Sequence, residues 1–205
     1  MLLSINTDNP DERKIRQVVE VLEKGGVIIY PTDTVYGLGC DVNQSAAVEK
    51  ICRIRGLDPR DAMLAMIFES ISQISQFVPP LDNATFKLLK KNLPGPFTFI
   101  LPAAGNVPKM FRNKKKTIGA RIPEHPIPLA IVHALGRPIL TTSLKSDDEI
   151  MEYFVEAEDI HEDFRKLVDV VMDGGPCGNM PSTIVDCTQD EPHIIRQGAG
   201  ALQYV

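Results

Sequence analysis

Two hydroxyl groups, a carboxylate and a phenol fall within one short stretch of the sequence, Thr32-Asp33-Thr34-Val35-Tyr36. The stretch follows Val27–Tyr30, an unbroken β-branched and aromatic run that predicts a strand buried on both faces. Pro31 lacks an N–H and would end that strand, and binding sites in open sheets collect at strand ends. The stretch predicts either a ligand-binding loop or ordinary Thr-Asp-Thr turn chemistry.

Arginines gather at a second place. Arg53, Arg55 and Arg60 surround the turn that follows a helix predicted from Ser45 to Gly56. Guanidinium groups match the geometry of phosphate, but cations are also favoured and solvated at any helix C-terminus. Both interpretations remain open for these arginines.

The one strongly basic run immediately precedes a predicted strand at 117–122. It indicates a solvated loop or, if functional, a surface for polyphosphate or RNA backbone. Aromatic residues do not alternate with the lysines, so a stacking platform for single strands is not indicated. The run consists of Lys109, Arg112, Lys114, Lys115 and Lys116.

Further polar residues lie at the ends of other predicted strands. Ser143 and Lys145 follow one strand, Ser182 precedes another, and Arg196 leaves a third into a glycine turn. For the hydroxyls, structural and functional interpretations are equally open. The sequence contains no P-loop and no Ser/His/Asp set arranged for an obvious nucleophile.

The elements that would position these residues predict an α+β domain. Seven predicted strands and several helices, some joined by short hairpin-length links, favour a mixed sheet over a regular βαβ winding. The strands are expected at 27–30, 97–101, 117–122, 138–142, 168–172, 183–187 and 193–196. Helices are expected from about residue 11 to Gly25-Gly26, from Ser45, at 83–91, at 126–135 and within the exposed acidic stretch 147–163.

Bulk composition restricts the class of protein. The 205 residues are 43% hydrophobic and can form one domain, 1–205, around one core. No apolar run reaches the roughly 18 residues that span a bilayer, and we expect a cytoplasmic protein without membrane contact. Four cysteines and four histidines lack zinc-ligand spacing, so no structural metal is expected. With a net charge of −5, any surface that binds nucleic acid must be local.

Five segments, taken in order, resemble the YrdC/YciO family of threonylcarbamoyl-AMP synthases from Gly25 to Gly200. The closest similarity is to the YciO branch, which keeps an extended central basic segment. The segments are Gly-Gly-Val-Ile-Ile-Tyr-Pro-Thr-Asp-Thr-Val-Tyr-Gly-Leu at 25–38, Leu-Pro-Gly-Pro-Phe-Thr at 93–98, Ile-Gly-Ala-Arg-Ile-Pro-Glu-His-Pro at 118–126, Pro-Ser-Thr-Ile-Val-Asp at 181–186 and Ile-Arg-Gln-Gly-Ala at 195–199.

This resemblance implies a twisted mixed sheet flanked by helices, with a basic concave surface. It implies ATP, threonine and bicarbonate as substrates, Mg²⁺ with the nucleotide, and threonylcarbamoyl-AMP and pyrophosphate as products. That adenylate serves the N6-threonylcarbamoyl modification of tRNA adenosine. The alternative is a YciO-type protein that binds double-stranded RNA, tRNA or the ribosome and has weak or no synthase activity.

The resemblance also implies roles for single residues. Thr32 and, more weakly, Tyr36 would contact the amino-acid substrate, while Arg121 and Ser182 would hold its carboxylate and the neighbouring phosphate. Ser143, Lys145 and Arg196 would lie on the nucleotide side. Arg55 and Arg60 would act with Arg121 in catalysis, and Lys114, Lys115 and Lys116 are the candidates for RNA binding.

Two departures from the family pattern matter. Arg55-Gly56-Leu57 stands where the synthases show Lys-x-Arg, and Ser143-Leu144-Lys145 stands where they show Ser-x-Asn. The lysine is a pure donor that carries charge, unlike the amide that it replaces. Losing one phosphate cation would weaken binding about 10- to 100-fold, which impairs a site without necessarily abolishing it.

Overall fold

Ten strands form one mixed sheet in the computed structural model, which describes residues 1–58, 64–105, 116–145 and 153–204. The strand order is β1-β8-β2-β3-β7-β4-β6-β5-β9-β10. Four of the pairings are parallel, β1–β8, β2–β8, β4–β6 and β5–β9, and the other five are antiparallel. The strands are β1 (Leu2–Ser4), β2 (Val27–Tyr30), β3 (Gly37–Asp41), β4 (Ala65–Ile67), β5 (Phe97–Pro102), β6 (Thr117–Arg121), β7 (Ile139–Ser143), β8 (Val170–Asp173), β9 (Thr183–Asp186) and β10 (His193–Arg196).

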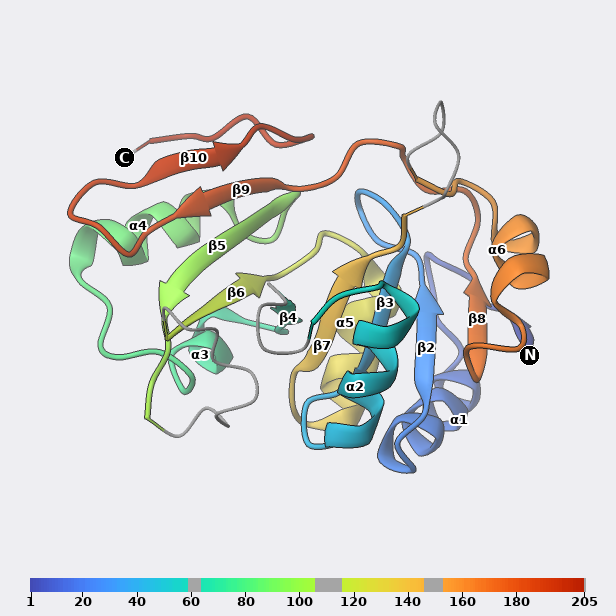
Figure 1. Ribbon diagram of the computed structural model, residues 1–205. Helices are drawn as coiled ribbons and strands as arrows, with labels where there is room; N and C mark the ends of the chain where they lie inside the picture. Colours follow the sequence, from blue (N-terminus) through green and yellow to red (C-terminus); the bar gives the residue numbers. More distant parts are fainter. Residues whose placement is uncertain (59–63, 106–115, 146–152, 205) are drawn as a thin grey trace.

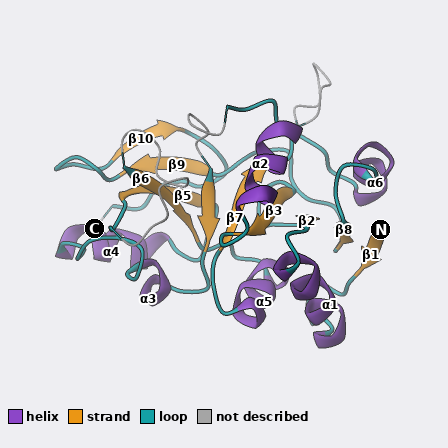
Figure 2. Ribbon diagram, turned by 60° about the horizontal axis from the view of Figure 1, so that its bottom comes forward, coloured by secondary structure: helices purple, strands orange, loops and turns teal. Residues whose placement is uncertain are grey.

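Helices cover both faces of the β8-β2-β3-β7 region. Helices α1 and α5 lie on one face and α2 lies on the other (Figures 1 and 2). Alternate residues of β2 point to the two sides, Ile28 and Tyr30 toward α1 and α5, Val27 and Ile29 toward α2. The helices are α1 (Glu12–Glu23), α2 (Ser45–Ile54), α3 (Ile71–Ile74), α4 (Asn83–Asn92), α5 (Pro126–Leu135) and α6 (Ala157–Phe164).

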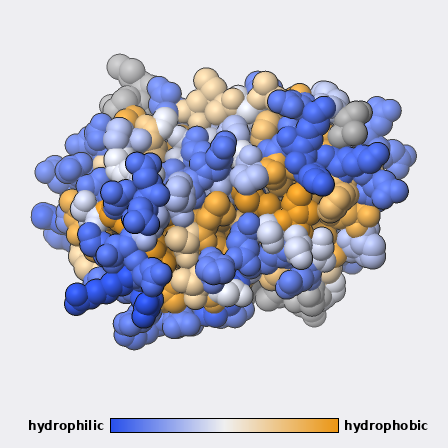
Figure 3. Space-filling view, turned by 180° about the vertical axis from the view of Figure 1, so that it is seen from behind, coloured by the Kyte–Doolittle hydropathy of each residue, from blue (hydrophilic) through white to orange (hydrophobic). Residues whose placement is uncertain are grey.

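The sheet changes direction between β7 and β4. Figure 1 shows β5 and β6 running across the direction of β2 and β7, with α3 and α4 beside them. The sheet therefore has two sides that meet at this bend, one with β2, β3 and β7 and the other with β4, β5 and β6. Seen from behind, hydrophobic residues occupy the middle of the surface, and hydrophilic residues gather around them (Figure 3). In the described parts of the chain no helix is long and apolar enough to cross a membrane.

The predicted mixed sheet with flanking helices is confirmed, and the seven predicted strands are all present, with boundaries that differ by up to two residues. The structure adds β1, β3 and β4, which the sequence patterns did not indicate. Strand β3 was missed because Gly37 and Gly39 weaken its strand signal. Both glycines leave room for the ring of Tyr30, since a Cβ at either position would lie about 3 Å from that ring. The Tyr30 hydroxyl thereby reaches across β3 to Thr141 on β7, 2.6 Å away.

A buried ion pair fixes the end of β3 to the start of β7. Arg137 donates from Nε and NH2 to the two carboxylate oxygens of Asp41, at 2.9 and 2.6 Å. The Asp41 side chain is fully buried and that of Arg137 is 31% exposed. Removing one partner of such a pair leaves a poorly compensated charge.

We therefore expect Asp41→Asn to lower the free energy of unfolding by about 3 kcal/mol. Urea denaturation followed by circular dichroism measures the change. Glu12→Gln is the matched control, because the Glu12–Arg16 pair is largely exposed and should contribute less than about 1 kcal/mol. Equal effects of the two substitutions would contradict the role assigned to Asp41.

Candidate functional site

A pocket of about 160 Å³ lies where the two sides of the sheet meet. The lining includes residues at the starts of β3, β4, β5 and β9 and at the ends of β6, β7 and β10. Side chains distant in sequence are thereby brought together. The lining residues are Val35, Tyr36, Gly37, Arg55, Ala65, Thr98, Arg121, Thr141, Thr142, Ser143, Lys145, Tyr153, Ser182, Ile184 and Arg196.

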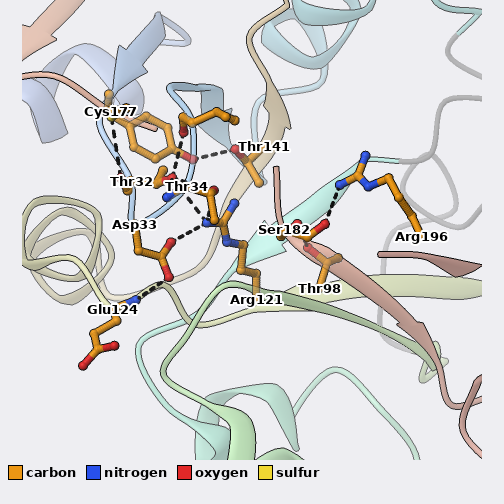
Figure 4. Close-up of polar contacts among 12 residues, drawn as sticks. Thr32, Asp33, Thr34, Thr98, Arg121, Glu124, Thr141, Cys177, Ser182 and Arg196 are labelled. Atoms are coloured by element: carbon orange, nitrogen blue, oxygen red, sulfur yellow. Dashed lines mark hydrogen bonds and ion pairs between the residues drawn. The ribbon is translucent and has the colours of Figure 1, made fainter. Parts of the chain in front are cut away.

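Arg121, the last residue of β6, contacts three side chains of the loop after β2. One terminal nitrogen donates to Thr34 Oγ1 at 2.6 Å and to Thr32 Oγ1 at 3.2 Å, and it also contacts Asp33 Oδ1 (Figure 4). The second oxygen of Asp33 accepts from the backbone N–H of Glu124 at 3.0 Å. These contacts attach the loop after β2 to the loop after β6.

The Thr32 hydroxyl supports that loop from within. It donates to the carbonyl of Val35 at 2.7 Å and accepts from the backbone N–H of Thr34 at 3.1 Å. Thr32 is only 5% exposed and does not line the pocket. In this structure it holds the position of Arg121 from behind the pocket wall.

Tyr36 closes the pocket on the side of the segment that crosses from β8 to β9. Its hydroxyl donates to the carbonyl of Gly175 at 2.7 Å, and burial raises the pKa of the phenol well above its usual value. Cys177 of the same crossing segment lies 3.6 Å from the carbonyl of Thr32, and burial raises its pKa to about 11. Both groups are neutral at physiological pH, so neither brings negative charge to the pocket.

Ser182 and Arg196 form the opposite wall. The Ser182 hydroxyl lies 2.9 Å from that of Thr98, and Arg196 donates to the Ser182 carbonyl at 2.8 Å (Figure 4). Among the described residues, the buried Nε atoms of Arg121 and Arg196 have no hydrogen-bond partner. A buried donor without a partner in the protein is a group that a bound water or anion can satisfy.

Positive charge dominates the described lining of this pocket. Arg55, Arg121, Lys145 and Arg196 come from four separate elements, and the described lining includes no carboxylate. Asp33 balances the charge of Arg121 from behind. Cations and hydroxyls without competing acids form a surface suited to an anionic ligand with several oxygens, such as a phosphate chain or a carboxylate.

The fold is that of a known family. Residues 20–198 match the Sua5/YciO/YrdC family model, described as "Telomere recombination". The chain therefore belongs to the Sua5/YciO/YrdC family. It is 42% identical over 198 residues to the uncharacterized protein YciO of Escherichia coli K12, covering 96% of this chain and 94% of the relative. It is 31% identical to the threonylcarbamoyl-AMP synthase of Bacillus subtilis, covering 95% of this chain and 55% of that protein.

Solved structures give the same result. The crystal structure of E. coli YciO superimposes with a TM-score of 0.92 at 40% identity, covering 99% of this chain and 98% of that one. Sua5 from P. abyssi in complex with L-threonine gives a TM-score of 0.85 at 28% identity, covering 97% of this chain and 57% of that one. The mixed-sheet architecture is therefore shared with both branches of the family.

Seven of the residues singled out in the sequence line this one pocket, namely Tyr36, Arg55, Arg121, Ser143, Lys145, Ser182 and Arg196. Thr32 lies behind the pocket in contact with Arg121. Arg60, Lys114 and Lys115 fall outside the described residues. Lys116 is exposed and precedes Thr117, whereas Arg121 is at the other end of the same strand. Lys116 therefore does not belong to the pocket.

Sequence reasoning missed Thr98, Tyr153 and Ile184 as lining residues. Thr98 and Ile184 lie on strands that were predicted correctly, next to each other in the β5–β9 register. Only that register shows which side chains reach the pocket. Tyr153 carried no signal, because it lies within the acidic stretch 147–163, which has no clear periodicity.

Gly198, in the turn after β10, packs against the backbone of the pocket wall that carries Ser182. A Cβ at this position would collide with the carbonyl oxygen of Pro181 and the backbone of Ser182. Gly198 also donates its N–H to Thr183 Oγ1 at 2.9 Å, so the glycine has little room to move away.

We expect Gly198→Ala to lower the free energy of unfolding by about 1–3 kcal/mol, because overpacking against backbone forces the chain to shift. Chemical denaturation measures this. Gly105→Ala is the control, since a Cβ there meets nothing within 4 Å. A Gly198→Ala protein as stable as the control would show that the turn is not tightly constrained.

Proposed function

We propose that this protein is an ATP-dependent adenylating enzyme of the threonylcarbamoyl-AMP synthase type. The observation that carries the proposal is the convergence of four cations and several hydroxyls on one pocket whose described lining has no carboxylate. The similarity to B. subtilis threonylcarbamoyl-AMP synthase and to Sua5 bound to L-threonine supports threonine as the amino acid.

In the proposed reaction the amine of threonine attacks the carbon of bicarbonate, and water leaves to give a carbamate. A carbamate oxygen then attacks the α-phosphorus of ATP and expels pyrophosphate. Two anions must be held together and charge grows on phosphate, so the protein contributes orientation and electrostatic stabilisation.

The residues divide between the two substrates. Arg121 and Ser182 would hold the carboxylate of threonine, with Thr32 and Asp33 fixing the orientation of Arg121. Ser143, Lys145 and Arg196 would contact the nucleotide, and Arg55 at the C-terminal end of α2 would face its phosphates. Tyr36 would supply a neutral wall beside the amino acid.

Protein ligands for Mg²⁺ are not part of this proposal. No group of three or more metal-binding side chains occurs in the described residues, and the carboxylate of Asp33 is already bonded to Arg121. The described residues therefore do not fit a protein-held ion. An ion entering with ATP would be bound by the phosphate oxygens.

Pyrophosphate release tests the proposal. Wild-type protein with ATP should release pyrophosphate only when threonine and bicarbonate are both present, and faster with threonine than with serine or glycine. No release with any amino acid, at protein concentrations comparable to that of ATP, would refute it.

Arg55→Met should lower kcat/KM about 10- to 100-fold, because one charge-assisted contact to phosphate is lost. Lys87→Met on the exposed face of α4 is the control and should leave kcat/KM unchanged. An Arg55→Met enzyme with wild-type kcat/KM would remove Arg55 from the site.

RNA binding by the basic run is the alternative. Its support is the exposed Lys116. This lysine precedes the first residue of β6, whereas Arg121 is the last residue of that strand, so Lys116 belongs to a surface separate from the pocket. Affinity for double-stranded RNA should fall steeply with salt, and neutralising Lys114, Lys115 and Lys116 together should lower the salt slope. Binding that is insensitive to salt, or absent, would exclude this function.

A further inference from the structure

Lys145 and Tyr153 meet at the rim of the pocket. The two residues form an isolated antiparallel bridge, so their backbones lie directly opposite each other. The ammonium nitrogen of Lys145 lies 5.6 Å from the centroid of the Tyr153 ring, within the range of a cation–π contact. Both residues line the pocket.

The two side chains differ in mobility. Tyr153 is only 3% exposed, so its ring is a fixed surface. Lys145 is an exposed residue on a long flexible stem, and such an ammonium loses much rotamer freedom when it is held in one place. A ring that already restricts the ammonium reduces the freedom that remains to be lost when an anion binds.

The charges around the pocket indicate what Lys145 adds. Arg121 is already balanced by Asp33 in a buried pair. Leu57, the apolar residue of the Arg55-Gly56-Leu57 turn, is 39% exposed and does not line the pocket. Lys145, which follows the end of β7, brings a cation to the same pocket as Arg55 and Arg196.

We propose that Lys145 is a phosphate-binding cation of this site, that Tyr153 is the residue that positions it, and that together they favour ligands with a phosphate chain. The inference rests on the proposed nucleotide site and deepens it. Tyr153 acts through Lys145, so the ring face matters and the phenol hydroxyl does not.

Calorimetric binding of inorganic tripolyphosphate tests this directly, without turnover. Lys145→Asn should weaken binding about 10- to 100-fold and reduce its salt dependence, whereas Lys145→Arg should retain most of the affinity. Lys87→Asn is the matched control and should bind like wild type. Wild-type affinity in Lys145→Asn would overturn the assignment of Lys145.

Tyr153 is tested by a double-mutant cycle with the same probe. Tyr153→Leu should weaken binding about 2- to 10-fold, because the ammonium then loses more rotamer freedom when the anion binds, and Tyr153→Phe should not. In the Lys145→Asn background, Tyr153→Leu should have no further effect. Equal losses in both backgrounds, or a loss with Tyr153→Phe, would show that Tyr153 does not act through Lys145.

Two further measurements separate the possible failures. Thermal unfolding identifies any variant that is destabilised, and the binding of Tyr153→Leu is measured at a temperature at which that variant is folded; Tyr153→Phe, which keeps the ring, tests the hydroxyl alone. Wild-type protein that binds tripolyphosphate through Lys145 but releases no pyrophosphate with threonine would contradict the proposed function and leave this inference standing.

Discussion

The buried contact between Arg121 and Asp33 is the interaction on which the rest of the site depends. Their side chains are 7% and 9% exposed, and removing two charges from water is costly unless the remaining polar atoms are also bonded. Here the hydroxyls of Thr32 and Thr34 accept from the guanidinium, and the backbone of Glu124 donates to the carboxylate. The contact therefore joins the loop after β2 to the end of β6, across the bend in the sheet.

This arrangement has an electrostatic consequence. Because Asp33 balances Arg121, that guanidinium serves as a fixed, directional donor more than as a source of net charge. The other cations of the described lining are Arg55, Lys145 and Arg196, which come from other elements.

The family and most elements could be predicted from the sequence, because local signals were strong there. Asp11 caps α1 by accepting from the N–H of Lys14 at 3.0 Å, and Gly136 ends α5 in the left-handed conformation. Strand β3 could not be predicted, since its glycines are explained by the ring of Tyr30, which comes from the neighbouring strand. Strand β1 is only three residues long and pairs with β8, about 170 residues away.

The sequence by itself determined which residue types are available for chemistry. It identified hydroxyls and cations at the ends of strands and indicated the family through five ordered segments. Only the tertiary structure decided how they are used. Strand order brings Ser182 next to Thr98 and places Thr32 behind Arg121. These outcomes depend on pairing register and on burial between distant segments, which no local pattern of residues encodes.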